Sequence, residues 1–415
     1  MTTANERPER CFFMRASSKT LEIYQSAWPV SKPGSGRGTG TETRSPLPEH
    51  APPYLPLGFP YPAHLLYNKK TMRAAFLTGV RTIEIREVPA PRVTRPDDVL
   101  VRSQAVGVCG SDLHYFLSGS VGGDKVSYPF IPGHECAGVV EEVGRGVTRV
   151  KPGDAVVVEP AVSCGTCDQC RTGRPHTCRK LLFLGHYGEL TGGMAEFALA
   201  PERNCVPLPA KMSIVQGVLA EPLSIALYAA GLAGSVRGKT AGILGAGPIG
   251  LCAAMVLKAE GAGALFMTDK VEARVKAART AGADWTGNPD REDIVAEILG
   301  RDSLGLDIVF ECCGDQSALD QAVALLKPGG TLVVVGIPLE PRMSFESGKI
   351  RRKEIRVQSV RRQNKCLERA VGMIHAGRVK LDFLATHFFK LEEAGAAYET
   401  AAARSDGVLK AIVQP

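Results

Sequence analysis

Two patterns of apolar positions divide the chain. Between Met72 and about Pro222, short β-branched runs are separated by Pro and Gly, which predicts strands joined by turns. From there to Ser359, strand-like apolar runs alternate with Ala-, Leu- and Lys-rich stretches of helical composition. Such alternation predicts a parallel sheet flanked by helices. Mixed elements return after Ser359, so a β-rich domain is expected to surround an α/β domain in the sequence.

The predicted elements are short and separated by turn residues. The strands expected in the β-rich part are Ala74–Thr78, Thr82–Val88, Val99–Val106, Val139–Val143 and Ala155–Val158. Those expected in the α/β part are 240–244, 265–269, 306–310 and 331–335, with helices at 250–259, 272–281 and 316–326. The architecture predicted from the pattern is therefore α/β with a second, β-rich domain.

The first 71 residues have a different texture. They hold 10 of the 28 prolines, and residues 29–62 are rich in Pro, Gly, Ser and Thr without apolar periodicity. Such a segment buries too little apolar area to offset its ordering entropy. We expect residues 1–71 to be a disordered leader, or Met72 to be the true start. No apolar run predicts a secretory signal, and Glu6, Glu9 and Glu22 argue against a mitochondrial transit peptide.

Composition and charge exclude several partners. The 415 residues are 44% hydrophobic and 22% charged, as in ordinary globular proteins, so wholesale disorder is excluded. The net charge of +7, of which residues 1–71 carry +4, falls short of a nucleic-acid-binding footprint. No run approaches the roughly 20 apolar residues of a membrane span. We therefore expect a cytoplasmic protein without nucleic-acid or membrane partners.

A glycine-rich turn follows the first strand of the predicted α/β domain. It has the spacing Gly-x-Gly-x-x-Gly at Gly245, Gly247 and Gly250 and opens a helical run. These glycines let the backbone approach a pyrophosphate, whose charge the helix N-terminus stabilises. Asp269 ends the next strand, where a carboxylate binds ribose hydroxyls and repels a 2′-phosphate. This context predicts NAD binding, tempered by Lys270; the alternative is a glycine-rich turn of another α/β protein.

Four cysteines lie close together in a loop rich in Gly and Pro. Their spacing, Cys-x2-Cys-x2-Cys-x7-Cys, suits a tetrahedral structural Zn²⁺ site. A disulfide framework is disfavoured because no secretion signal is evident, and an iron–sulfur cluster is disfavoured because the spacings differ from ferredoxin runs. The residues are Cys164, Cys167, Cys170 and Cys178.

Three separated segments carry further metal-type residues. They are Cys109–Tyr115, Gly133–Glu135 and Glu221–Pro222. A single His or Cys is more often structural than metal-binding. Spacing alone does not join the three segments into one site.

These motifs together resemble the zinc-containing medium-chain dehydrogenases. The similarity runs from Met72 to Pro415 and looks strongest to the polyol branch of sorbitol (L-iditol), xylitol and L-arabinitol dehydrogenases. The motifs occur in the family's order with similar gaps: Cys109–Tyr115, Gly133–Glu135, the four-cysteine loop, Glu221–Ser224 and Gly245–Gly250. The resemblance implies a Rossmann, doubly wound parallel-sheet coenzyme domain at 223–360. It also implies a β-rich GroES-like catalytic domain at 72–222 and 361–415.

The resemblance implies a catalytic zinc site. Cys109 and His134 match its direct ligands, Glu135 looks like a third ligand, and Glu221 lies near the metal-bound water. The roles of the two glutamates can exchange during turnover. Simple alcohol dehydrogenases carry Cys where this chain has Glu221, and the carboxylate favours polyols because it also hydrogen-bonds water or a substrate hydroxyl.

The resemblance also implies roles around this site. Ser111 and His114 match a proton relay, Tyr115 a polyol contact, and Arg361 an arginine that reaches both cofactor and substrate. The alternatives are a helix-capping Ser111, a surface His114 and an ordinary solvated Arg361. Further cofactor contacts are implied at Ile249, Arg274, Val335, Gly336 and Ile337.

The implied protein is an oxidoreductase that transfers hydride from a secondary hydroxyl of a polyol to NAD, giving a ketose. It would hold one catalytic and one structural zinc per chain and form a homo-oligomer, a dimer or tetramer. Arg362 stands where an aromatic follows the arginine in animal sorbitol enzymes, and those enzymes lack the four-cysteine loop. The alternatives are an L-threonine or 2,3-butanediol dehydrogenase, or a non-catalytic NAD-binding structural protein. An intact Cys109, His134 and Glu135 argue against the last.

Overall fold

The computed structural model describes residues Tyr67–Pro415, so nearly all of the expected leader lies outside the described residues. Strand β1 (Tyr67–Gly79) pairs antiparallel with β2 (Thr82–Pro91). Residues 67–71, which the sequence pattern assigns to the leader, therefore belong to this strand. Two isolated bridges, Ala74 to Ala195 and Leu77 to Phe130, connect the hairpin to later parts of the chain.

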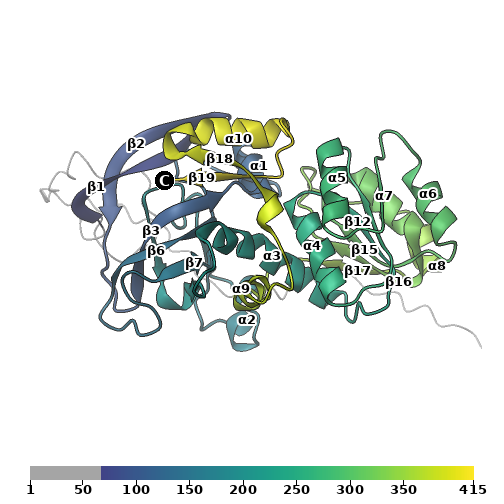
Figure 1. The fold of residues 1–415 in the computed structure, drawn as a ribbon, viewed down its shortest axis with the longest axis horizontal. Coiled ribbons are helices and arrows are strands. Elements are labelled where there is room, and N and C mark those ends of the chain that lie inside the picture. Colours follow the sequence, from purple (N-terminus) through teal and green to yellow (C-terminus); the bar gives the residue numbers. More distant parts are fainter. Residues whose placement is uncertain (1–66) are drawn as a thin grey trace, which may run out of the picture. The chain divides into compact units, whose positions relative to one another are not determined.

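A seven-stranded sheet forms the β-rich domain around β3 (Asp98–Gly107). Its order is β11 (Cys205–Pro207), β7 (Ala155–Val158), β6 (Glu135–Val143), β3, β19 (Lys410–Gln414) and β18 (Ala385–Lys390), with β10 (Phe197–Pro201) also on β3. All pairs are antiparallel except β18 with β19. The last strands of the chain thus complete the sheet that contains the early strand β3, as Figure 1 shows for the yellow β19 beside β3.

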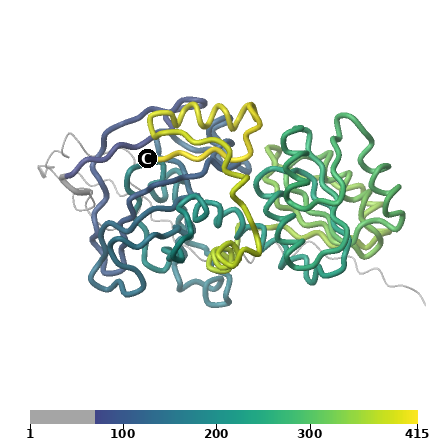
Figure 2. Tube along the Cα trace, viewed as in Figure 1, coloured from purple at the N-terminus to yellow at the C-terminus, as the bar shows by residue number. Residues whose placement is uncertain are grey.

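Short elements decorate this domain. Helix α1 (Gly110–Ser118) follows β3, and α10 (Ala394–Ala403) packs against α1, β2, β18 and β19. In Figure 2 the C-terminal part of the chain, in yellow, lies against the N-terminal part of the described chain, in purple, as the contact between α10 and β2 requires. The remaining pieces are β4 (Ser120–Val121), β5 (Asp124–Lys125), β8 (Ala161–Val162), α2 (Asp168–Arg171) and β9 (Leu182–Phe183).

A six-stranded parallel sheet forms the α/β domain. Its order is β14 (Trp285–Gly287), β13 (Leu265–Thr268), β12 (Ala241–Leu244), β15 (Leu306–Glu311), β16 (Leu326–Val334) and β17 (Arg356–Ser359). The helices between these strands are α4 (Pro248–Ala259), α5 (Glu272–Thr280), α6 (Ile294–Arg301), α7 (Gln316–Leu325) and α8 (Ser347–Arg352). The order reverses between β12 and β15, which is the switch point where such sheets bind ligands. This confirms the doubly wound coenzyme fold beside a β-rich domain.

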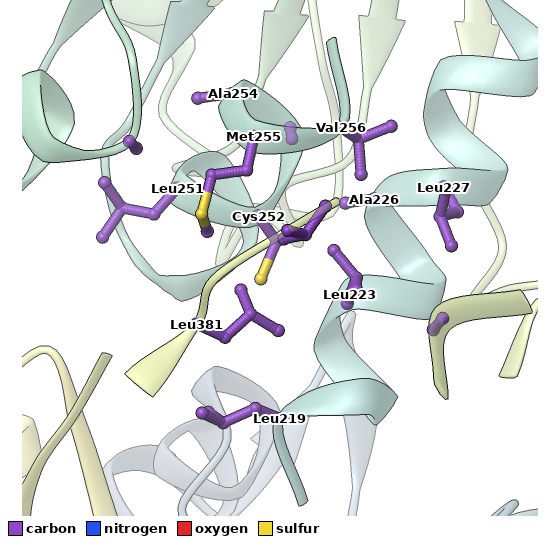
Figure 3. Close-up of a cluster of buried hydrophobic side chains, with 14 of the residues drawn as sticks. Leu219, Leu223, Ala226, Leu227, Leu251, Cys252, Ala254, Met255, Val256 and Leu381 are labelled. Carbon is purple, nitrogen blue, oxygen red and sulfur yellow. The ribbon is translucent and has the colours of Figure 1, made fainter. Parts of the chain in front are cut away.

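Helix α3 (Ile214–Leu232) joins the two sheets. It packs against α4 and α9 (Leu367–His375) on one side and against β3, β6 and β7 on the other. Figure 3 shows Leu219, Leu223 and Leu227 of α3 in the same buried cluster as Leu251, Cys252 and Val256 of α4. Among the described residues, α3 alone is long and apolar enough to cross a membrane, but 67% of that window is buried in the protein. Its hydropathy is explained by this core position.

Core packing at α3 can be tested by truncation. Leu223 is fully buried, so Leu223→Ala removes contacts and leaves a cavity, which should lower the free energy of unfolding by about 2–5 kcal/mol. Leu304→Ala, at a residue that is 81% exposed, should change it by less than about 0.5 kcal/mol. Urea unfolding of both variants measures the difference. Equal effects would show that α3 does not carry the core.

Candidate active site and cofactor site

The first metal-type segment opens helix α1. Cys109 is the N-cap residue, and its backbone N–H donates to Oδ2 of Asp112 at 3.0 Å. Ser111 lies on the same turn, with its Oγ 3.5 Å from Sγ of Cys109. An acidic side chain in the first helical turn satisfies an orphan N–H and complements the helix dipole. Asp112 therefore fixes the direction in which the Cys109 side chain leaves the helix.

His134, which immediately precedes β6, comes to the same place. Its Nε2 lies 3.5 Å from Oγ of Ser111, and its Nδ1 lies 3.2 Å from Oδ1 of Asp112. Both His134 and Asp112 are buried. The carboxylate thus lies beside one ring nitrogen, at ion-pair distance but without hydrogen-bond geometry, while the other nitrogen faces Ser111. Sequence reasoning missed Asp112, although its position three residues after Cys109, in the first turn of a helix, was a usable signal.

Glu135 has a different neighbour from the one expected. Both of its carboxylate oxygens accept hydrogen bonds from Nζ of Lys410, at 2.7 and 2.8 Å, and both residues are almost fully buried. Lys410 also donates to the carbonyl of Val108, at 3.1 Å. Gly107 leaves room for this pair, because a Cβ there would lie 2.0 Å from Oε2 of Glu135. The carboxylate predicted as a zinc ligand is therefore committed to Lys410 in this arrangement.

Glu221 lies on α3, directly before the helix-internal Pro222. Its Oε1 accepts a hydrogen bond from Nη2 of Arg362 at 3.2 Å, and the same Nη2 donates to Glu159 at 3.0 Å. Burial raises the pKa of Glu221 to about 7, against the lowering by the charges of Arg362 and His134. The charge of His134 thus acts on the Glu221 carboxyl, and no described residue donates a hydrogen bond to its second oxygen, Oε2.

The four-cysteine loop forms a compact thiol cluster. One Sγ from each of Cys164, Cys167, Cys170 and Cys178 lies within 4.8 Å of the others, with measured separations of 3.6, 3.8 and 4.0 Å. Four thiolates about 2.3 Å from one Zn²⁺ would be roughly 3.8 Å apart, so the geometry matches a tetrahedral site. Backbone N–H groups approach the sulfurs, and those of Thr166 and Cys167 help lower the pKa of Cys164 to about 5. The predicted four cysteines are thus brought together.

The glycine turn lies at the carboxyl edge of the parallel sheet. Gly245 has a φ of +101°, and a Cβ on Gly250 would lie 1.9 Å from the carbonyl oxygen of Gly245. Both positions therefore require glycine. Gly247 is the N-cap of α4, in which Ile249 occupies the first turn. The open backbone of this turn is the surface that a pyrophosphate would approach.

Asp269 closes the turn from the neighbouring strand. Its Oδ2 accepts the N–H of Ala246 and its Oδ1 the N–H of Val271, both at 2.8 Å. Nη1 of Arg274 would lie 3.7 Å from a Cβ on Gly247, and its buried Nε has no hydrogen-bond partner. Arg274 therefore flanks the glycine turn with an unsatisfied donor, as expected of a residue near a ligand phosphate or ribose.

The other predicted cofactor residues lie at the end of β16. The N–H groups of Val335 and Gly336 donate to the carbonyl of Glu311, at 2.8 and 3.0 Å. A Cβ on Gly336 would lie 2.2 Å from the backbone nitrogen of Gly314. Ile337 is exposed at this edge. The structure therefore brings the predicted glycine turn, Asp269 and the β16 end to one edge of the sheet.

Three residues predicted to relay protons or bind substrate make no hydrogen bond to Cys109, His134 or Glu221 in the described part of the chain. His114 is partly buried, its Nδ1 has no hydrogen-bond partner, and burial lowers its pKa. Tyr115 is buried and packs edge-on against Phe130, at a centroid distance of 5.7 Å. Arg361 is exposed, whereas its neighbour Arg362 contacts Glu221. The relay and substrate roles of these residues stay predictions.

The geometry can now be compared with known proteins. The chain matches the alcohol dehydrogenase GroES-like domain over residues 95–210 and the zinc-binding dehydrogenase domain over residues 248–376. It is 34% identical over 347 residues to sorbitol dehydrogenase of Bacillus subtilis (strain 168), covering 83% of this chain and 98% of that protein.

Solved structures agree in fold. A zinc-binding dehydrogenase from Sinorhizobium meliloti 1021 bound to NADP has a TM-score of 0.77 and 31% identity, covering 84% of this chain and 100% of that one. The 2R,3R-butanediol dehydrogenase from Bacillus subtilis has a TM-score of 0.75 and 30% identity, covering 83% and 99%.

Domain matches, identity and site layout agree with one another. A thiol, an imidazole and a carboxylate converge in the β-rich domain, and a dinucleotide-type glycine turn lies in the α/β domain. The resemblance found in the sequence is thereby confirmed. The chain belongs to the zinc-containing medium-chain dehydrogenase family, in its polyol dehydrogenase branch, and is an alcohol dehydrogenase of the kind that uses zinc and a nicotinamide cofactor.

Proposed function

We propose that this enzyme oxidises a secondary hydroxyl of a polyol to a ketone, with NAD as the hydride acceptor. The observation that carries this proposal is that the carboxyl group of Glu221 is buried and close enough to His134 for the charge of His134 to lower its pKa. A carboxylate at this position can accept a hydrogen bond from a hydroxyl next to the reacting one, which a thiolate does poorly. The similarity to sorbitol dehydrogenase supports the same substrate class.

We infer two zinc sites per chain. The four thiols fit a structural ion by their mutual distances. At the candidate active site, Cys109 and His134 supply a soft and a borderline donor, and Ser111 lies 3.5 Å from both. We favour Glu221 over Glu135 as the carboxylate nearest a catalytic ion, because both oxygens of Glu135 are bonded to Lys410. We therefore propose Glu221 as the carboxylate that completes the catalytic zinc site.

Bound zinc supplies a Lewis acid that lowers the pKa of an alcohol, and bound NAD supplies a hydride acceptor. The chain's own residues orient the metal ligands and carry the released proton away. Oδ1 of Asp112 lies 3.2 Å from Nδ1 of His134, and a proton on Nδ1 facing this carboxylate would leave the Nε2 lone pair directed into the site. Oxidation of a secondary hydroxyl releases one proton, and we propose that Oγ of Ser111, 3.5 Å from Nε2 of His134, accepts this proton and passes its own toward His114.

NAD is favoured over NADP by Asp269. Its carboxylate sits against the glycine turn and would repel a 2′-phosphate. The neighbouring Arg274 has an unpaired Nε and argues the other way, and one structural relative is bound to NADP. We give the charge of Asp269 more weight than that of Arg274, because two backbone hydrogen bonds fix the Asp269 carboxylate at the turn.

A second secondary alcohol is the main alternative. The similarity to 2R,3R-butanediol dehydrogenase is comparable in extent, so a vicinal diol is the competing substrate, with L-threonine as another. A non-catalytic role is disfavoured because Cys109 and His134 both lie 3.5 Å from Ser111, and because the dinucleotide-type glycine turn is present. We further propose a cytoplasmic location and a homo-oligomer, dimer or tetramer.

The substrate proposal is tested by an assay of the purified protein. NADH formation is followed with sorbitol, xylitol, L-arabinitol, erythritol, L-threonine and 2,3-butanediol, each with NAD and with NADP. We expect turnover of at least one of the first three polyols, faster with NAD. Turnover of L-threonine or butanediol alone would replace the substrate, and activity with NADP only would overturn the argument from Asp269.

The two zinc sites should separate by mutation. Cys109→Ser should abolish turnover and reduce zinc from about two to about one per chain while the fold is retained. Cys164→Ser should also lose one zinc but lower the unfolding temperature, because the ion closes a long loop. Metal analysis and thermal unfolding of both variants provide the measurement. Full activity of the Cys109 variant would show that the catalytic site lies elsewhere.

The role of Asp112 can be measured separately. Asp112→Asn keeps the shape of the side chain but removes its charge, so the imidazole of His134 is held less firmly. Loss of such an outer partner typically costs about 10- to 100-fold in activity or metal affinity. Steady-state kinetics and zinc titration should show a loss in this range. An unchanged zinc affinity and kcat would contradict the proposed orientation of His134.

A further inference from the structure

Arg362 occupies a more central place than the arginine expected from the sequence. Its guanidinium is mostly buried, and Nη2 bridges two carboxylates, Glu221 at 3.2 Å and Glu159 at 3.0 Å. The guanidinium also lies 4.2 Å from the ring centroid of Phe183. The ring of Phe183 in turn packs against that of His134, at 5.1 Å between centroids. Phe183 therefore lies between the guanidinium of Arg362 and the imidazole of His134.

The backbone around Arg362 is held in an unfavourable conformation. Arg362 has a φ of +54°, in the left-handed region that favours glycine, and so does Lys365. A strained conformation of this kind persists when the surroundings over-determine it, and it is found disproportionately at functional sites. The strain indicates that the position of the Arg362 side chain is maintained at a cost in backbone energy.

Neighbouring residues supply the constraint. The side-chain amide of Gln363 donates to Glu159, and its carbonyl accepts the N–H of Cys366 at 2.6 Å. Nδ2 of Asn364 donates to the carbonyl of Gly173, in the four-cysteine loop, at 3.0 Å. The segment that carries Arg362 is thus tied to β7 through Glu159 and to the thiol cluster's loop through Asn364.

The guanidinium of Arg362 offsets the repulsion between the two carboxylates that it bridges. Glu159 and Glu221 are held by one nitrogen, so they lie close together in a poorly hydrated place. Two adjacent buried carboxylates repel each other, and a shared guanidinium offsets both charges. Without Arg362, Glu221 would turn away from Glu159 or take up a proton. Its position beside His134 therefore depends on Arg362.

We propose that Arg362 is a positioning residue of the active site, which fixes the carboxylate of Glu221 by bridging it to Glu159 above the Phe183 ring. The inference rests on the proposed function in that Glu221 belongs to the catalytic site. Loss of the side chain should lower kcat by about 10- to 100-fold, as for other outer partners of a metal site, with little change in KM. The cysteine-loop zinc should remain bound.

Chemical rescue provides the test. Arg362→Gly removes the guanidinium and suits the positive φ, so the variant isolates the side chain from the backbone strain. Millimolar guanidinium chloride should then restore kcat several-fold and raise the unfolding temperature of this variant, because a ligand that binds the folded state stabilises it. Urea, which has the same shape and no charge, should do neither.

A matched control has the same backbone conformation. Lys365→Gly, at an exposed residue with the same φ of +54°, should keep wild-type kcat and show no response to guanidinium. If Arg362→Gly does not fold, kcat should fall in the order wild type, Arg362→Lys, Arg362→Gln, since Lys keeps the charge and loses the bridge. An Arg362→Gln variant at least as active as Arg362→Lys would overturn the proposal.

The outcomes are distinguishable from failure of the proposed function. Turnover is measured with whichever alcohol the wild type oxidises fastest, so a different substrate leaves the test intact. If the wild type oxidises none of the panel, the proposed function fails, and the guanidinium-dependent rise in unfolding temperature still tests the bridge. Wild-type kcat in Arg362→Gly, or loss of turnover without response to guanidinium in kcat or unfolding temperature, would overturn the proposal.

Discussion

The site depends on pairing every buried carboxylate. Acidic side chains surround His134 closely, and a buried charge without a partner would cost several kcal/mol or take up a proton. Asp112 has the Cys109 N–H and His134, Glu135 has Lys410, and Glu221 shares Arg362 with Glu159. Each carboxylate is thereby held in one direction, and the arrangement is prepared before any ligand arrives. A site built this way loses little energy to reorganisation during the reaction.

Helix α3 links this charge arrangement to the cofactor domain. It carries Glu221 on a segment whose other side chains pack against α4, the helix that begins at the glycine turn. One continuous apolar cluster includes residues of both sheets, such as Ala137 and Ile243, together with Leu223. Because interiors are close-packed, movement of α3 cannot leave the glycine turn undisturbed.

The features that the sequence predicted well are those formed by residues close together in the chain. The glycine turn, the strand ending at Asp269 and the four cysteines each lie within one short segment, where spacing and chemistry coincide, and the structure brings each together. The division into two sheets followed from hydrophobic periodicity, which burial dictates directly. The return of the chain to the β-rich domain, also expected from the pattern, is seen in the pairing of β19 with β3, whereas the exact boundaries at 222 and 360 were implied by the resemblance and stay predictions.

What the sequence could not predict was pairing across long separations and the direction of single side chains. Lys410 is 275 residues from Glu135, and Arg362 is 141 residues from Glu221, so no local pattern announces either partner. Arg361 was the expected arginine, yet a left-handed residue at the next position reverses which of two adjacent side chains faces the site. Such a turn costs energy locally, and the two distant carboxylates, together with the hydrogen bonds of Gln363 and Asn364, offset that cost. Its conformation is therefore a tertiary property, and any sequence change at Glu159 or Glu221 would remove the reason for it.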